Sequence, residues 1–230
     1  MLSKVPAYLV HIFTALGVVF GFLALVATVN EKIPEAFLWL ALALFVDGVD
    51  GTLARAVNVK ENTPEIDGAT LDHIIDYLNY VVVPVFIFYT LGMAPESYLL
   101  LLSATILLVS CFTFTNTNIK TDDFYFSGFP ANWNIVVLYF YIFESPEWIN
   151  FIFVILFCVL SFIPFKYVHP FRVVEFRKIT LMITSIWMVT TTILLFDISF
   201  SDPIFTSINF SIWLLTNVYF AGNVFYRSMK

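Results

Sequence analysis

Charged residues are scarce in this sequence. They make up 12% of its 230 residues, whereas soluble domains carry about 25%, so a soluble globular domain is excluded. A basic arm or stripe is also missing, and the net charge is −6, which argues against binding to nucleic acid. The chain contains no low-complexity tract and no internal repeat.

Cysteine is rare as well. The two cysteines, Cys111 and Cys158, both fall in apolar runs, where a thiol usually behaves as a small buried hydrophobe. We therefore predict that they do not form a disulfide.

Hydrophobic residues, in contrast, are abundant, at 60% of the chain, and the mean hydropathy is +0.89. A transmembrane helix needs roughly 20 mostly apolar residues, and this criterion predicts an all-α integral membrane protein, with one domain over residues 1–230. The first apolar run is longer than a signal-peptide core and has no clear cleavage site, so it is interpreted as a retained span. About eight transmembrane helices are predicted: Ala7–Val29, Pro34–Ala54, Leu71–Met93, Tyr98–Asn116, Phe129–Phe143, Trp148–Val168, Ile179–Phe196 and Ile204–Phe225.

Basic residues predict the orientation of these spans. If the N-terminus is cytoplasmic, every one of the 11 basic residues except Lys32 lies in a cytoplasmic segment, as the positive-inside rule requires. This bias predicts an even number of spans with both termini in the cytoplasm, and it places residues 47–76 at the cytoplasmic face.

Carboxylates are concentrated in that segment. Asp47 and Asp50 are three residues apart in the second span, and Asp72 and Asp76 are four apart at the start of the third. Residues with either spacing share one face of a helix. Two antiparallel helices can therefore bring four carboxylates together near the membrane boundary, while Asp67 is interpreted as a loop or cap residue.

Such a cluster needs cations. One aspartate within the hydrocarbon costs about 2.5–3.5 kcal/mol, and like charges close together raise that cost. Hard divalent ions suit a site made only of oxygen ligands, so Mn²⁺, Mg²⁺ or Ca²⁺ is expected. Two such ions about 4 Å apart would form a clamp for phosphoryl displacement.

Small residues and one arginine accompany the carboxylates. Gly51, Ala54 and Gly68 leave room for a ligand or a backbone to approach closely, and Arg55 can bind a phosphate through its planar fork. The combination indicates a diphosphate site at the membrane surface. A divalent-cation transporter is the alternative, but it predicts acidic residues at both membrane faces, whereas these aspartates cluster on one side.

This region resembles the signature of the CDP-alcohol phosphotransferases, and every signature position is filled: Asp47-x2-Asp50-Gly51-x2-Ala54-Arg55, then Gly68-x3-Asp72-x3-Asp76. The stretch between Arg55 and Gly68 is longer than in the common family pattern, and a similar insertion occurs in one branch, the bacterial phosphatidylcholine synthases. Residues 67–84, 128–134 (GFPANWN) and 169–172 (HPFR) also resemble that branch.

The resemblance implies a function and a role for each signature residue. It implies a bundle of transmembrane helices that forms a homodimer in the bacterial cytoplasmic membrane. The implied reaction joins choline to CDP-diacylglycerol and releases CMP, with the help of two divalent ions, Mn²⁺ or Mg²⁺. Asp76 would also be the general base. The implied metal ligands are Asp47, Asp50, Asp72 and Asp76, and the implied CDP pocket is Gly51, Ala54, Arg55 and Gly68.

The acceptor site is less clear from the residues. A quaternary ammonium prefers aromatic faces and carboxylates, but serine, glycerol phosphate and inositol phosphate are acceptors in the same family, and His169 and Arg172 could bind a phosphate of an acceptor or a lipid headgroup. His11 and His73 are more simply interpreted as hydrogen-bonding residues of the bundle. The remaining acceptor candidates are Tyr77, Tyr80, Asp122, Asp123, Tyr125, Phe129 and Trp133.

Overall fold

The computed structural model describes residues 4–116, 125–168, 176–196 and 203–228. These fall into two compact units, which are treated separately. The first comprises Met1–Phe114 and Asn132–Phe151, and the second comprises Thr115–Ala131 and Ile152–Lys230.

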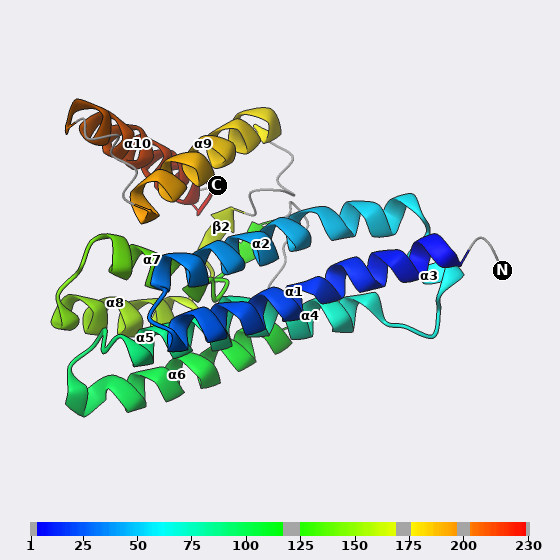
Figure 1. Ribbon diagram of the computed structural model, residues 1–230, viewed down its shortest axis with the longest axis horizontal. Helices are drawn as coiled ribbons and strands as arrows, with labels where there is room; N and C mark the ends of the chain where they lie inside the picture. The colour runs from blue at the N-terminus through cyan, green and yellow to red at the C-terminus, as the bar shows by residue number, and fades with distance from the viewer. Residues whose placement is uncertain (1–3, 117–124, 169–175, 197–202, 229–230) are drawn as a thin grey trace. The chain divides into compact units, whose positions relative to one another are not determined.

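The first unit is a bundle of helices (Figure 1). Its third long helix is continuous over Gly68–Thr90, but a π-helical turn, η1, separates α4 from α5 within it. The elements are α1 (Val5–Val29), α2 (Ile33–Ala56), α3 (Val59–Asn62), α4 (Gly68–Tyr77), η1 (Leu78–Val82), α5 (Val83–Thr90), α6 (Glu96–Thr115), α7 (Trp133–Ile142) and the start of α8 (Glu147–Leu160).

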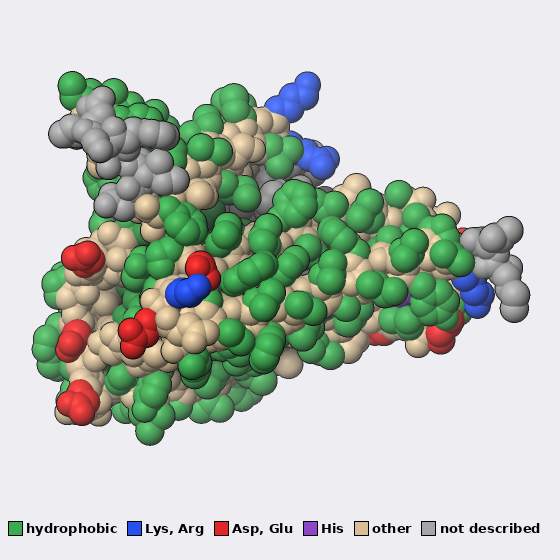
Figure 2. All heavy atoms as spheres, viewed as in Figure 1, with side chains coloured by type: hydrophobic (Ala, Val, Ile, Leu, Met, Phe, Trp, Pro, Cys, Tyr) green, Lys and Arg blue, Asp and Glu red, His purple; other side chains and the backbone are tan. Residues whose placement is uncertain are grey.

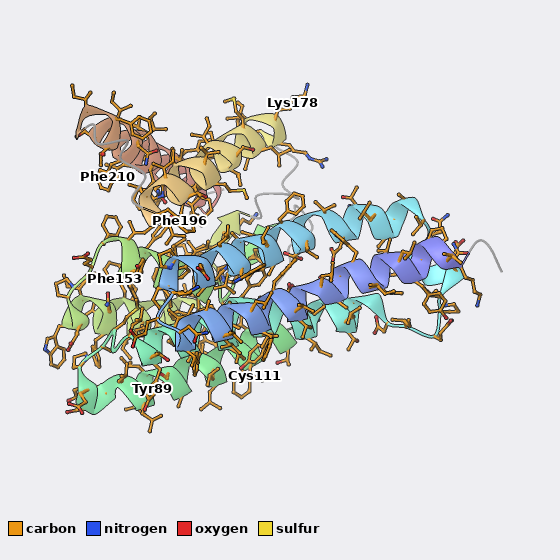
Figure 3. All side chains as sticks on the ribbon, viewed as in Figure 1. Tyr89, Cys111, Phe153, Lys178, Phe196 and Phe210 are labelled. Atoms are coloured by element: carbon orange, nitrogen blue, oxygen red, sulfur yellow. The ribbon has the colours of Figure 1, made fainter. Side chains whose placement is uncertain are left out.

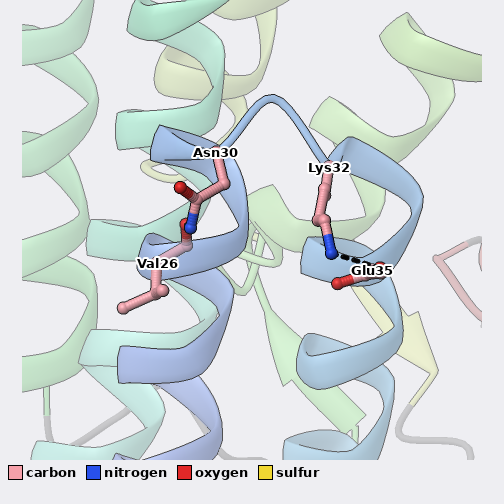
Figure 4. A network of polar contacts seen from close by, with 4 residues as sticks. All are labelled: Val26, Asn30, Lys32 and Glu35. Atoms are coloured by element: carbon pink, nitrogen blue, oxygen red, sulfur yellow. Dashed lines mark hydrogen bonds and ion pairs between the residues drawn. The ribbon is translucent and has the colours of Figure 1, made fainter.

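A tight turn joins α1 to α2 into an antiparallel hairpin (Figure 1). Asn30 ends α1, and its side-chain Nδ2 donates to the Val26 carbonyl at 2.8 Å. Glu31 follows with a φ of 61°. Lys32 then precedes α2 and pairs with Glu35 at 3.2 Å in the first helical turn (Figure 4), where a carboxylate also interacts favourably with the helix dipole.

The π-helical turn packs against two glycines of α1. Gly17 and Gly21 are four residues apart, the spacing that lets helices approach closely in membranes. Asn79 of η1 donates through Nδ2 to the Gly17 carbonyl at 3.0 Å. A Cβ on Gly17 would lie 2.5 Å from Ile75 Cγ2, and one on Gly21 would lie 2.4 Å from Asn79 Oδ1. The contact therefore requires glycine at both positions.

The second unit contains a small sheet and a pair of helices. Strands β1 (Tyr125–Ser127) and β2 (Lys166–Val168) pair antiparallel, with Phe126 opposite Tyr167. Helices α9 (Arg177–Leu195) and α10 (Pro203–Ser228) are joined by polar contacts, and four of the buried residues of α9 are threonines: Thr180, Thr184, Thr190 and Thr191. Trp213 Nε1, for example, donates to Thr191 Oγ1 at 2.9 Å, and Asn209 Nδ2 donates to the Thr190 carbonyl at 3.1 Å.

The all-α membrane architecture is confirmed, with corrections to two predicted spans. Span 129–143 is shortened to α7, which begins at Trp133, and span 148–168 ends as a helix at Leu160 and continues into β2. Pro130 and Pro164 explain both changes, because proline lacks an N–H and disfavours the helical conformation of the residue before it.

Within the described residues, six helices are long and apolar enough to cross a membrane. Helices α7 and α8 are apolar but only 10 and 14 residues long, and a 14-residue helix rises about 21 Å against a hydrocarbon thickness of about 30 Å. The number of spans therefore stays a prediction. The six are Val5–Val29, Ile33–Ala56, Gly68–Thr90, Glu96–Thr115, Arg177–Leu195 and Ile204–Tyr226.

The outer face of the α1–α2 hairpin is suited to lipid. Figure 2 shows many hydrophobic side chains over the two helices, with charged side chains towards both ends of the hairpin. Large side chains such as Leu9, Ile12 and Phe22 are each about 60% exposed. Neither cysteine is in a disulfide, as predicted: Cys111 is exposed on α6 (Figure 3), and Cys158 is buried in α8.

The close contact between α1 and η1 predicts the effect of Gly17→Ala. The new methyl group must displace Ile75, and over-packing of this kind costs about 1–3 kcal/mol, so the thermal midpoint in detergent should fall. Gly222→Ala in α10 is the matched control, because nothing beyond the neighbouring backbone of its own helix lies within 4 Å of its Cβ position and alanine favours a helix. An equal response of both variants would contradict the packing argument.

Candidate functional site

Three of the predicted carboxylates meet between α2 and α4. Asp47, Asp50 and Asp72 each offer one carboxylate oxygen, and the three oxygens lie within 4.8 Å of one another. Asp50 is buried, at 6% exposure, and the other two are half-buried. This donor set fits a hard divalent cation, which prefers carboxylate oxygens and offsets their mutual repulsion.

Asp76 belongs to the same pocket but lies outside that set of three. The pocket has walls from α1, α2, α4 and η1, and it is lined by Thr14, Ala43, Val46, Asp47, Asp50, Asp72, Ile75, Asp76, Asn79 and Tyr80. The structure thus brings all four predicted aspartates to one pocket. It also adds Thr14 and Asn79, which the sequence analysis did not select.

The two tyrosines that follow Asp76 have different surroundings. Tyr80 is buried, and its hydroxyl donates to Asp47 Oδ2 at 2.6 Å. Tyr77 is turned towards α6 instead. Its hydroxyl donates to the Leu107 carbonyl at 2.8 Å, and its ring packs edge-on against Phe114. Of these two acceptor candidates, only Tyr80 lines the pocket.

Asn79 lines the pocket and is buried, at 3% exposure. Its Nδ2 is bound to the Gly17 carbonyl, but its Oδ1 has no hydrogen-bond partner among the described residues. The signal that could have revealed this contact is the Gly17-x3-Gly21 spacing in the first span, since such a pair marks a close helix–helix approach.

The connection between α2 and α4 is anchored on α1. Tyr8 donates a hydrogen bond to Glu65, which lowers the pKa of that carboxyl group. A small hydrophobic cluster beside this contact joins Ala7 and Val10 of α1 to Val59 of α3, and Ala54 and Val57 pack against it. Ala54, a predicted CDP-pocket residue, thus helps to hold α3 in place.

Asp67 caps the N-terminus of α4, as predicted. Its Oδ1 accepts from the Ala69 N–H at 3.0 Å, and its Oδ2 accepts from the Thr70 hydroxyl at 2.7 Å. Hydrogen bonds from Thr70 and then from the Ala69 backbone lower the pKa of Asp67. The cap fixes the start of the helix that carries Asp72 and Asp76.

His11 packs on the glycine at the start of α4. Thr63 gives its only hydroxyl hydrogen to the Val59 carbonyl at 3.0 Å, so its oxygen accepts from His11 Nε2 at 3.0 Å. The tethered ring leaves little space, because a Cβ on Gly68 would lie 3.3 Å from His11 Cε1. His11 is thus a hydrogen-bonding residue of the bundle, as interpreted from the sequence.

Gly51 and Arg55 lie in the last turns of α2. Gly51 is half-buried, whereas Arg55 is exposed and its Nη2 donates to Thr52 Oγ1 at 3.1 Å. A cation in the last turn of a helix interacts favourably with the helix dipole, and this exposed guanidinium keeps further donors for an anion.

The other acceptor candidates are spread along the chain. Phe129 is buried against Phe157 and Tyr167 in the second unit, and Trp133 is buried in the first, where its Nε1 donates to Ser110 Oγ at 2.9 Å. Both have packing roles. Tyr125 begins β1, but its side chain is not described, and four candidates lie outside the described residues: Asp122, Asp123, His169 and Arg172.

Comparison with known proteins gives one consistent result. The model of the CDP-alcohol phosphatidyltransferase family matches residues 5–195. A phosphatidylcholine synthase of Pseudomonas aeruginosa is 40% identical over 229 residues, covering 100% of this chain and 94% of that protein. A phosphatidylcholine synthase of Mesorhizobium japonicum is 41% identical over 79% of this chain and 68% of that protein. A phosphatidylcholine synthase of Borreliella burgdorferi is 41% identical over 80% of this chain and 79% of that protein.

The contact between His11 and Gly68 can be tested by a double-mutant cycle. Gly68→Ala should lower the thermal midpoint in detergent, because the ring held by Thr63 cannot move aside for the methyl group. In a His11→Ala background the same substitution should be nearly neutral, since that ring is gone. Residues in contact show such non-additivity, so equal losses in both backgrounds would contradict the contact.

Proposed function

The chain belongs to the CDP-alcohol phosphatidyltransferase family, and on that premise we propose that it transfers the phosphatidyl group of CDP-diacylglycerol to choline. The choline oxygen bonds to the β-phosphorus, the bond from that phosphorus to the CMP oxygen breaks, and the hydroxyl proton leaves. The products are phosphatidylcholine and CMP. The relatives are phosphatidylcholine synthases, which supports choline as the acceptor, and the carboxylates that meet within 4.8 Å support the chemistry.

Asp47, Asp50 and Asp72 would hold divalent metal, with Asp76 as a further ligand at the same pocket. Two ions are proposed, Mn²⁺ or Mg²⁺, because these ions accept all-oxygen sites and retain positions for phosphate oxygens. When bound, the metal supplies positive charge against the negative charge that develops on the phosphoryl oxygens and on the departing CMP.

Asp76 is proposed as the general base. It lines the pocket beside the three clustered carboxylates, where it can accept the proton of the choline hydroxyl. A carboxylate close to cations is a weak base. It serves here by orienting the hydroxyl and taking the proton as the oxygen–phosphorus bond forms.

Arg55 and the small residues near it are proposed to bind the CDP group. The exposed guanidinium of Arg55 is free to form a bidentate contact with the diphosphate. Gly51 and Ala54 lie on the same stretch of α2, and Gly68 lies at the start of α4. Both helices that carry the aspartates therefore also carry small residues near them in the sequence.

The trimethylammonium group of choline requires negative charge and an aromatic face. Tyr80 is the aromatic residue among those lining the pocket, and it lies beside the carboxylates. We therefore place choline next to this ring. The loop residues Asp122, Asp123 and Tyr125 stay as sequence-based candidates for the same site.

The cellular setting follows from the family and from the basic residues. We propose that the protein is a homodimer in the cytoplasmic membrane of a bacterium, with the pocket open to the cytoplasm. The distribution of Lys and Arg supports this orientation.

The reaction is tested by measuring CMP release from CDP-diacylglycerol in detergent with Mn²⁺ or Mg²⁺. Release that depends on both choline and metal is the expected result. Release with serine, glycerol phosphate or inositol phosphate, but not with choline, would overturn the acceptor assignment alone. No release with any of these alcohols would overturn the transferase itself and favour a transporter.

Asp76→Asn tests the general base. The amide keeps the shape of the side chain but cannot take a proton, and general-base catalysis contributes about 10²–10⁴-fold, so kcat should fall by about that factor. Stabilisation of the protein by added CDP-diacylglycerol, followed as a shift in thermal midpoint, should persist. Turnover at the wild-type rate would rule out the role.

A further inference from the structure

We propose that Tyr80 is a positioning residue, whose buried hydroxyl holds one oxygen of Asp47 so that the other oxygen faces the metal. This inference rests on the proposed function, since it assigns the Asp47 carboxylate to metal binding. It gives Tyr80 a role distinct from contact with the choline acceptor.

The contact itself is short and buried. The Tyr80 hydroxyl lies 2.6 Å from Asp47 Oδ2, within the range of charge-assisted O–H···O⁻ bonds. The tyrosine must be the donor, because an ionised carboxylate has no hydrogen to give. With the ring at 9% exposure, water competes little for the hydroxyl, so the bond restrains the carboxylate strongly.

The π-helical turn brings this hydroxyl to Asp47. Tyr80 lies in η1, four residues after Asp76. A π-helical turn inserts one residue into an α-helix, which offsets the two flanking helical faces by about 100°. Asn79 and Tyr80 can therefore both be buried at the pocket, together with Asp72 and Asp76 of α4. Beyond the π-helical turn, α5 packs on α7 through Phe88 and Phe140.

Holding Oδ2 has a consequence for the cluster. Asp47 is one of three aspartates whose oxygens lie within 4.8 Å, and like charges at that distance push the side chains apart. A hydrogen bond that fixes the rotamer of Asp47 opposes this movement. Partners of metal-binding carboxylates typically change metal affinity or activity by about 10–100-fold when removed.

Tyr77 provides a matched comparison on the same helix. Its hydroxyl also donates one hydrogen bond, but to the Leu107 carbonyl on α6, and it is not among the residues that line the pocket. Removing either hydroxyl deletes one oxygen and one hydrogen bond from the same continuous helix. Only the removal at Tyr80 should change the metal site.

The test is Mn²⁺ binding to the purified protein in detergent without substrate, followed by the electron paramagnetic resonance signal of free Mn²⁺. Tyr80→Phe should raise the dissociation constant about 10-fold or more, and Tyr77→Phe should leave it at the wild-type value.

Coupling to Asp47 is tested in an Asp47→Asn background. There the carboxylate charge is already lost, so Tyr80→Phe should change Mn²⁺ affinity far less than in the wild type. Equal changes in the two backgrounds, or wild-type Mn²⁺ affinity in Tyr80→Phe, would overturn the inference. Absence of Mn²⁺ binding to the wild-type protein would also overturn the inference. That result differs from absence of CMP release, which would overturn the proposed function.

A purely structural role for the hydroxyl gives a different pattern. The thermal midpoint of metal-free Tyr80→Phe would then fall, while the Mn²⁺ affinity of the folded fraction would equal that of the wild type. Such a pair of results would also overturn the proposal. The expected pattern is the reverse, a midpoint near wild type without metal and a smaller rise of the midpoint when Mn²⁺ is added.

Discussion

The mutual repulsion of the carboxylates between α2 and α4 is the constraint on which the site depends. Three oxygens from Asp47, Asp50 and Asp72 lie within 4.8 Å, and Asp50 is buried. Burial and like charge both disfavour the ionised form, so a bound cation and rigid helices would both stabilise this arrangement. The packing around the site supplies that rigidity.

Helix α1 supplies much of it, although it carries none of the four aspartates. Its glycines accept close packing from η1, and its first turns hold the connection before α4 through Tyr8–Glu65 and His11–Thr63. The stretch between Arg55 and Gly68 therefore has a structural use, because it forms α3 and ties the start of α4 to the N-terminal end of α1. The position of Asp72 and Asp76 along the pocket follows from that attachment.

The convergence of the aspartates could be predicted from the sequence because helical spacing is local: three or four residues place two side chains on one face whatever surrounds them. The cap role of Asp67 was predictable for the same reason. The π-helical turn was not, because its inserted residue is favoured by burial of Asn79 and Tyr80 against α1 and α2. Trp133 and Phe129 were ambiguous because aromatic residues make up 19% of the chain, and in the structure both fill packing positions.

Metal binding and helix packing are linked by the same repulsion. A cation that binds the folded cluster stabilises it by mass action, and the folded cluster binds the cation well only while α2, α4 and η1 hold the oxygens together. We therefore expect a change that loosens the Gly17–Asn79 contact to weaken metal binding at the proposed site, although neither residue is an assigned ligand. By the same linkage, metal held at the proposed site would favour the contacts that α1 makes with the pocket.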